Sequence, residues 1–152
     1  MAGAEHADLR ELLARVLPEL DGFARGVHPR TLTESGLAAA LAELTGGLRL
    51  RVELDVMADR LRPEVEAAAY FVCSEAVANT LKHAEATLVL VRVRKDGDRV
   101  CVEVVDDGVG GADPLSGSGL QGLDDRVTAF GGVLRVDEAA TAGTRVICRL
   151  PN

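Results

Sequence analysis

The stretch from Pro63 to Ala84, PEVEAAAYFVCSEAVANTLKHA, contains the features that decide the fold. It opens with a proline, which is favoured in the first turn of a helix because that position needs no backbone donor. Apolar residues then recur at helical spacing without an interrupting glycine or second proline. The sequence therefore predicts one long helix, from Pro63 to about His83, with an apolar side that packs on a sheet and a polar side that faces solvent or a ligand.

Four polar side chains of this helix fall within an arc of about 100° if the chain turns every 3.6 residues. They are Glu75, Asn79, Lys82 and His83. Carboxylate and amide oxygens can hold a hard cation or its waters, whereas ammonium and imidazole groups donate to phosphate oxygens. The arc therefore suits a metal-bound polyphosphate, and a solvated helix face is the alternative that has the same spacing.

The segments on either side of this helix show a mixture of helix and strand patterns. Helices are predicted over 9–23, 33–44 and 120–130, and strands over 48–56, 88–94, 99–105, 133–136 and 144–150. This order lacks the strict strand-helix alternation of a doubly wound parallel sheet. The expected fold class is α+β, a two-layer sandwich in which three helices cover one face of a mixed sheet of about five strands.

Composition narrows the class of protein. The chain has 152 residues, a formal net charge of -7 and 47% hydrophobic residues, which fits one globular domain. The acidic balance argues against a general electrostatic grip on nucleic acid or anionic lipid. The three cysteines are odd in number and scattered along the chain, which predicts reduced thiols. No apolar run is long enough to span a bilayer, and no signal peptide is recognised. We therefore expect a cytoplasmic chain without direct membrane contact, whose parent protein could still be membrane-anchored.

Two glycine-rich segments follow the strand over 99–105. In Asp106–Gly110, a carboxylate at a strand end can accept a hydrogen bond from an exocyclic amine such as that of adenine, and the glycines let a flat ring approach the backbone. A glycine-rich turn fixed by its aspartates is the structural alternative. Gly117–Gly122 leads directly into a helix, where bare backbone amides can bind phosphate.

The second segment also matches the dinucleotide fingerprint G-x-G-x-x-G. In that fold a strand runs straight into the glycines, whereas here a polar loop over 111–116 precedes them. Dinucleotide binding is therefore a weak alternative, and no P-loop motif is present. Thr144 follows a glycine at the start of the last strand, a pattern that also suits an ordinary strand entry.

Taken in order, these segments resemble the ATP-binding catalytic domain of bacterial sensor histidine kinases, in the Bergerat-type fold shared with gyrase and the 90-kilodalton heat-shock chaperones. Tyr70–Ala84 is similar to the N box, Asp106–Gly110 to the D-x-G-x-G box, Gly117–Gly122 to the G-x-G-L box, and Gly143-Thr144 to the final glycine-threonine element. Residues 24–29 resemble the junction of the subfamily paired with helix-turn-helix response regulators. The resemblance divides the chain into the tail of a dimerisation helix with its junction, 1–28, and a catalytic domain, 29–152.

The resemblance also implies roles for individual residues. Asn79 would hold Mg²⁺, and Glu75 would order the metal's water and assist proton removal from the accepting histidine. Asp106 would bind the adenine amine. The remaining ATP-binding residues would be Lys82 and His83 at the phosphates, Gly108 and Gly110 around the adenine, Gly117, Gly119 and Leu120 in the G-x-G-L box, and Thr144 at the adenine end.

The family's reaction also requires an accepting histidine on an upstream helix, and none of His6, His28 or His83 fits that role. We therefore expect an ATP-dependent protein-histidine kinase domain of a two-component system that donates phosphate to a histidine outside this chain. That histidine would lie on the dimerisation domain of the parent kinase, with a response regulator as indirect partner. The chain is then either an excised fragment or a naturally short kinase. A non-catalytic, nucleotide-dependent regulator of the same fold, like the anti-sigma proteins, is the alternative.

Overall fold

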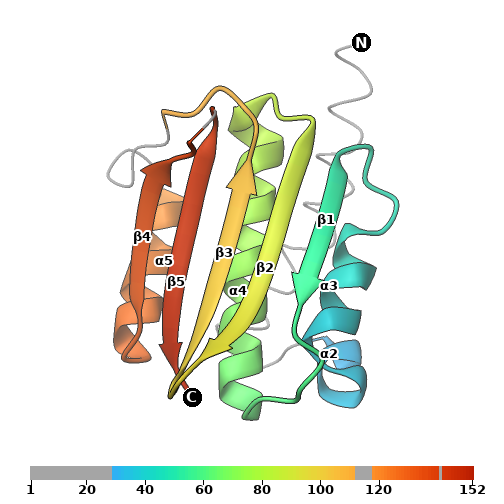
Figure 1. Cartoon of the computed structure of the whole chain (residues 1–152), viewed down its shortest axis with the longest axis vertical. Helices are drawn as coiled ribbons and strands as arrows, with labels where there is room; N and C mark the ends of the chain where they lie inside the picture. The colour runs from blue at the N-terminus through green and yellow to red at the C-terminus, as the bar shows by residue number, and fades with distance from the viewer. Residues whose placement is uncertain (1–28, 112–117, 141) are drawn as a thin grey trace.

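A five-stranded mixed sheet forms one layer of the protein in the computed structural model, which describes residues 29–111, 118–140 and 142–152. The strands are β1 (Arg51–Val56), β2 (Leu88–Asp96), β3 (Arg99–Asp106), β4 (Val133–Glu138) and β5 (Thr144–Pro151). They lie in the order β1-β2-β3-β5-β4 (Figure 1), with β1 parallel to β2 and the other neighbouring pairs antiparallel.

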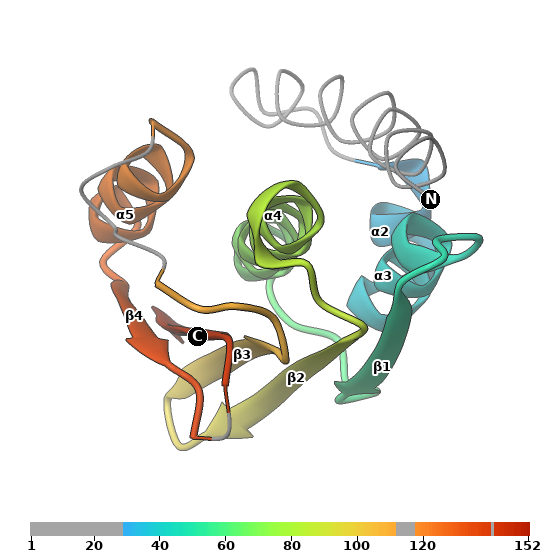
Figure 2. The same ribbon diagram turned by 90° about the horizontal axis from the view of Figure 1, so that it is seen from above.

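Helices form the second layer. They are α2 (Arg30–Ser35), α3 (Leu37–Thr45), α4 (Pro63–Asn79), the π-helical turn η1 (Thr80–Ala84) and α5 (Ser118–Ala129). All of them cover the same face of the sheet, with α4 in the middle between the α2–α3 pair and α5 (Figure 2). The predicted α+β sandwich with a mixed sheet is confirmed, and the described strands do not form the doubly wound parallel sheet that the sequence argued against.

The β2–β3 hairpin forms the centre of the sheet because of its alternating valines. Every second residue of each strand points to the helices, and these side chains are almost fully buried: Val89, Val91, Val93, Val100, Val102 and Val104. Asp96 pairs with Arg99, so the connecting turn has two residues. Its first residue, Gly97, has φ of 60°, a conformation that glycine adopts without steric cost.

The sequence predicts that helix α4 is buried along one apolar side only, but in the structure the helix is buried on all sides. Every residue from Val65 to Ala78 is buried, including Glu66, Ser74 and Glu75. The reason is its central place, since neighbouring helices cover the flanks that an edge helix would expose to water (Figure 2). The polar residues of α4 therefore face other parts of the protein.

Element boundaries differ from the predictions at three places. The helix predicted over 33–44 is two helices, because Gly36 has φ of 88° and breaks the first helix before α3 begins. Strand β1 begins at Arg51, three residues after the start of the alternating pattern. The α-helical part of the long helix ends at Asn79, and the chain continues as a π-helical turn. The predicted helix over 9–23 lies outside the described residues.

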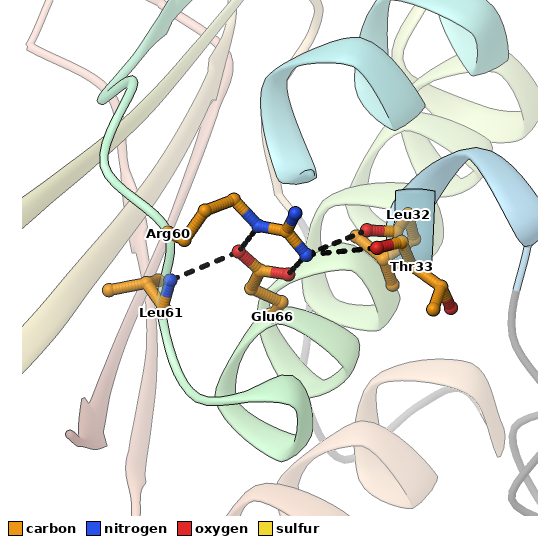
Figure 3. Close-up of polar contacts among 5 residues, drawn as sticks. All are labelled: Leu32, Thr33, Arg60, Leu61 and Glu66. Carbon is orange, nitrogen blue, oxygen red and sulfur yellow. Dashed lines mark hydrogen bonds and ion pairs between the residues drawn. The ribbon is translucent and has the colours of Figure 1, made fainter. Parts of the chain in front are cut away.

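A buried carboxylate connects α2 to α4 (Figure 3). Glu66 is 2% exposed, and its carboxylate accepts two hydrogen bonds from Arg60: Nε donates to Oε1 at 2.9 Å, and Nη2 donates to Oε2 at 3.1 Å. Leu61 N also donates to Oε1, at 3.0 Å. The same Arg60 Nη2 donates to the carbonyl oxygens of Leu32 and Thr33 near the end of α2. One guanidinium thus satisfies the charge of Glu66 and two carbonyls of the neighbouring helix.

The cysteines are free, in agreement with the reduced thiols predicted. Burial raises the pKa of Cys148 to about 12 and also raises the pKa of Cys73, so both thiols stay protonated near neutral pH. No helix in the described part of the chain is both long and apolar enough to span a bilayer.

Candidate functional site

Asp106, at the end of β3, connects three parts of the chain. Its side chain is buried, and Oδ1 accepts hydrogen bonds from the backbone N–H groups of Gly108 at 2.9 Å and Thr144 at 3.1 Å. Its other oxygen, Oδ2, lies 3.2 Å from the hydroxyl of Thr80 at the end of α4. The end of β3, the start of β5 and the end of the central helix therefore meet at one carboxylate.

Two glycines allow the backbone to pass close to Asp106. Gly143 has φ of 93°, and a Cβ at this position would lie 2.0 Å from the carbonyl oxygen of Asp106, a distance that no side chain could occupy. Gly110 has φ of 70°, and a Cβ there would lie 3.1 Å from the carbonyl oxygen of Gly143. The D-x-G-x-G segment and the glycine-threonine segment thus meet backbone to backbone.

Glu75, Asn79 and Gly119 form a second cluster, between α4 and the first turn of α5. A Cβ on Gly119 would lie 2.9 Å from Glu75 Oε1 and 3.6 Å from Asn79 Oδ1. The absence of a side chain at Gly119 therefore lets two oxygen-bearing side chains reach the beginning of α5. Asn79 is also adjacent in sequence to Thr80, which contacts Asp106, so both clusters lie at the carboxyl end of the central helix.

Burial raises the pKa of Glu75, because removal from water disfavours the charged carboxylate. The positive charges of Lys82 and Arg126 oppose this effect and lower the pKa of Glu75. Arg126 also lies over the ring of Phe71, with its Cζ 4.9 Å from the ring centroid. The Arg126 guanidinium of α5 thus lies over Phe71, which is one helical turn before Glu75 on α4.

Asn79 carries a buried donor that has no partner. Its Nδ2 makes no hydrogen bond within the part of the chain that the structure describes. A buried amide hydrogen without an acceptor costs free energy, and an oxygen-rich ligand would remove that cost. The nearby oxygens of Asn79 and Glu75 are ligands that a hard cation such as Mg²⁺ prefers. The residues present therefore fit a phosphate-bound cation.

The site unites most of the residues predicted from the sequence. Glu75, Asn79 and Gly119 meet in one cluster, and Asp106, Gly108, Gly110 and Thr144 meet in the other. Lys82 acts on Glu75 through its charge. Leu120, by contrast, is partly buried and packs against the hydrophobic core.

The prediction of one face from Glu75 to His83 assumed 3.6 residues per turn throughout, and this geometry ends at Asn79. Lys82 and His83 lie in the wider π-helical turn and are exposed, so the spacing argument does not apply to them. Gly117, the rest of the polar loop from residue 112 and the junction over 24–28 lie outside the described residues.

Sequence reasoning missed two residues of the site, Thr80 and Arg126. Thr80 sits within the quoted N box, but a threonine in a helix gives no sign of which acceptor its hydroxyl will meet. Arg126 belongs to a different helix, and its approach to Phe71 depends on how α5 packs against α4.

The two described glycines of the G-x-G-x-x-G match, Gly119 and Gly122, lie inside a helix. Strand β3 ends at Asp106, and Gly119 lies in the first turn of α5, with residues 107–118 between them. The dinucleotide interpretation is therefore not favoured. Among the described residues, no group of three or more histidine, cysteine, aspartate or glutamate side chains could hold a metal by itself.

Comparisons with known proteins agree with this geometry. The family model described as "Histidine kinase-, DNA gyrase B-, and HSP90-like ATPase" matches residues 64–152. The oxygen sensor histidine kinase NreB of Staphylococcus carnosus is 29% identical over 150 residues, which cover 92% of this chain and 43% of NreB. The sensor histidine kinase MctS of Rhizobium johnstonii is 30% identical over 154 residues, which cover 93% of this chain and 33% of MctS. The chain thus spans less than half the length of either relative.

Solved structures show the same fold. The blue-light activated histidine kinase of Erythrobacter litoralis EL346 matches with a TM-score of 0.61 and 24% identity, over 95% of this chain and 53% of that chain. The ATP binding domain of PrrB from Mycobacterium tuberculosis matches with a TM-score of 0.57 and 23% identity, over 78% of this chain and 90% of that domain. Because the family model covers more than half of the sequence, the chain belongs to the histidine kinase-, DNA gyrase B- and HSP90-like ATPase family.

Proposed function

We propose that this chain is the ATP-binding catalytic domain of a sensor histidine kinase, and that it donates the γ-phosphate of ATP to a histidine outside the chain. The observation that supports this most is the meeting of the Glu75–Asn79 pair with Gly119 next to the Asp106 cluster. Family membership and two relatives named as sensor histidine kinases support the same proposal.

Asp106 is the residue that would select the base. Its Oδ1 is held by two backbone donors, so the carboxylate has a defined orientation at the end of β3. A carboxylate held in this way accepts an N–H donor and repels a carbonyl oxygen. The site would therefore favour adenine, which carries an exocyclic amine, over a base with an oxygen at the same position. Gly108 and Gly110 would leave room for the ring, and Thr144 would support the adenine end.

Asn79 would hold Mg²⁺ directly and Glu75 would hold it through a water molecule. This small protein contribution suits magnesium, which keeps several waters and takes its other ligands from substrate phosphates. When bound, the ion would neutralise charge on the phosphates. Gly117 and Gly119 at the start of α5, together with Lys82 and His83, would contact the phosphates. Leu120 would help to form the same glycine box.

Glu75 would accept the proton that the attacking histidine nitrogen loses. Burial raises the pKa of Glu75, and a carboxylate with a raised pKa is a stronger base than an exposed one. Lys82 and Arg126 oppose this rise, because their positive charges favour the ionised carboxylate that a base must have. This chain would then supply the donor half of the reaction by positioning ATP and removing one proton.

The remaining expectations concern the parent protein. Residues 1–28 would be the end of a dimerisation helix and its junction, and 29–152 the catalytic domain. The partner would be the histidine-bearing dimerisation domain, with a response regulator downstream. The domain would work in the cytoplasm without nucleic acid or direct membrane contact, whether or not the parent is anchored in a membrane.

Calorimetry with ATP and MgCl₂ tests the binding half of the proposal. We expect the wild type to bind, Asp106→Asn to lose at least about tenfold in affinity, and Asp107→Asn to bind like the wild type. The two variants remove the same charge from neighbouring residues, but the Asp107 side chain contacts Thr87 and Leu88 instead of the site. Absence of wild-type binding, or equal binding by Asp106→Asn, would contradict the proposal.

Phosphoryl transfer tests the second half. The chain is mixed with γ-labelled ATP and a separately produced dimerisation domain of a related sensor kinase that carries its histidine. Label on that domain, dependent on Glu75, supports the kinase, and the chain alone should remain unlabelled. Binding of ATP without any transfer would favour the non-catalytic regulator of the same fold.

A further inference from the structure

Thr80 has a role that neither the family assignment nor the predicted site residues include. It is the first residue of η1 and is 5% exposed. Its Oγ1 lies 3.1 Å from the carbonyl oxygen of Ala76 and 3.2 Å from Oδ2 of Asp106. The hydroxyl carries a single hydrogen, so it can make a full hydrogen bond to only one of these two acceptors.

The hydrogen favours Asp106 for two reasons. The carbonyl oxygen of Ala76 already accepts the backbone N–H of Thr80, so its need for a donor is met. A hydrogen bond to an ionised carboxylate is also roughly twice as strong as one between neutral groups. The hydroxyl of Thr80 therefore donates to Oδ2 of Asp106, in a buried place where that bond is not weakened by water.

The acceptor capacity of Asp106 can then be counted. A carboxylate has about four lone-pair positions, two on each oxygen. The N–H groups of Gly108 and Thr144 occupy both positions on Oδ1. Thr80 occupies one position on Oδ2, and no other donor within the described residues reaches that oxygen. As far as the described residues go, one acceptor position is therefore left for a ligand.

We propose that Thr80 is a positioning residue for base selection, whose hydroxyl fills one side of Oδ2 so that Asp106 presents a single, directed acceptor to one N–H of the purine. This inference rests on the proposed function, because it assumes that the base lies against Asp106. Without the hydroxyl, Oδ2 would have two open positions, and water could take the one that a purine amine needs. The specificity for an amine would therefore depend on Thr80 as well as on Asp106.

The test compares two nucleotides in calorimetry with MgCl₂. One is ATP, and the other is purine riboside 5′-triphosphate, which carries hydrogen in place of the exocyclic amine. We expect the wild type to prefer ATP by about tenfold or more. Thr80→Val, which keeps the shape but removes the hydroxyl, should weaken ATP binding about tenfold and leave the analogue within about twofold of the wild type.

Thr80→Ser restores the hydroxyl without the methyl group and should recover most of the ATP affinity lost in Thr80→Val. Thr80→Ala removes both groups, so it should behave like Thr80→Val toward the two nucleotides. Thermal unfolding of each variant checks that the domain is folded. A merely structural role would reduce the affinity for both nucleotides by the same factor, and serine would not restore selectivity.

Several outcomes would overturn the inference. Equal losses for ATP and the analogue in Thr80→Val would show that the hydroxyl supports the site as a whole. Unchanged ATP affinity would show that Asp106 does not need Thr80. If the wild type binds both nucleotides equally, Asp106 does not select the base, and this result overturns the inference even if none of the variants folds. If it binds neither nucleotide, the proposed function itself is wrong, and this inference is wrong with it.

Discussion

Gly119 and Gly122 lie three residues apart on α5, and their surroundings lead to different predictions at the scale of a residue. A Cβ on Gly119 would lie 2.9 Å from Glu75 Oε1, whereas a Cβ on Gly122 would meet nothing within 4 Å. Gly122→Ala should therefore stabilise the protein by about 0.5–1 kcal/mol, because alanine favours the helix, and should leave ATP binding unchanged.

Gly119→Ala should act on the site rather than on folding. The added methyl group would displace the end of the flexible Glu75 side chain, which costs little stability but moves the carboxylate from its place beside Asn79. We expect at least about tenfold slower transfer of phosphate to a supplied dimerisation domain, since small displacements of reacting groups have large effects on rate. Unfolding curves and transfer rates of both variants check this pair. Equal transfer rates in Gly119→Ala and Gly122→Ala would contradict it.

Asp107 should make the stability of the protein depend on pH. Its carboxylate accepts hydrogen bonds from the Thr87 hydroxyl at 2.6 Å and from the backbone N–H groups of Thr87 and Leu88 at 2.8 and 2.9 Å. The Thr87 hydroxyl contributes most, and together these donors lower the pKa of Asp107 below its usual value of 3.8.

A carboxyl group whose pKa is lower in the folded than in the unfolded state stabilises the protein above the unfolded-state value. That contribution is lost as the pH falls through the folded-state value. The unfolding free energy of the wild type should therefore exceed that of Asp107→Asn at pH 7, and the difference should shrink below about pH 4. Urea titrations from pH 3 to 7 measure this difference. If it does not change with pH, the hydrogen bonds of Asp107 are not the cause.

The Arg60–Glu66 pair belongs to the scale of elements, because it joins α2 to the first turn of α4 (Figure 3). Arg60→Met should lower the free energy of unfolding, because the buried carboxylate of Glu66 would lose its partner. Glu66→Gln in the same chain should recover much of the loss, because the amide oxygen can still accept from Leu61 N without a buried charge. Urea denaturation of the two single variants and the double variant gives the coupling between the residues.

Additive losses in the Arg60 and Glu66 variants would show that the two side chains do not act as a pair.

The position of Arg60 also helps to explain why the helix predicted over 33–44 is broken at Gly36. Gly36 lies where a Cβ would come within 3.1 Å of Arg60 Cδ, so the glycine both ends α2 and leaves room for the arginine side chain. The positive φ of Gly36 therefore helps to arrange α2 and α3 around the Arg60–Glu66 pair.

At the scale of the whole molecule, ligand binding should raise the melting temperature. A ligand that binds only the folded state at 100 times its Kd adds about 2.7 kcal/mol to stability. For a chain of this length that corresponds to a rise in Tm of roughly 5 to 10 °C. We expect this shift with ATP and MgCl₂ in thermal scans of the wild type, and at most a small shift in Asp106→Asn. An equal shift in both proteins would place the ligand at another site.

Much of the architecture could be predicted because local patterns specify it. The alternating valines of β2 and β3 indicated two strands, and Pro63 marked the start of α4. Patterns of this kind depend on the period of the backbone, which each segment carries in its own sequence. They could not show that α4 is buried on all sides, since that depends on which helices lie beside it.

The candidate site divides in the same way. The sequence alone determined the order of the boxes, and with it the family and the glycines that let backbone segments approach Asp106. Only the tertiary structure decided that Gly119 faces Glu75 and that the hydroxyl of Thr80 reaches Asp106. The physical reason is distance along the chain. These contacts join residues 26 to 44 positions apart, whose meeting is set by packing between elements, while spacing within one segment describes only that segment.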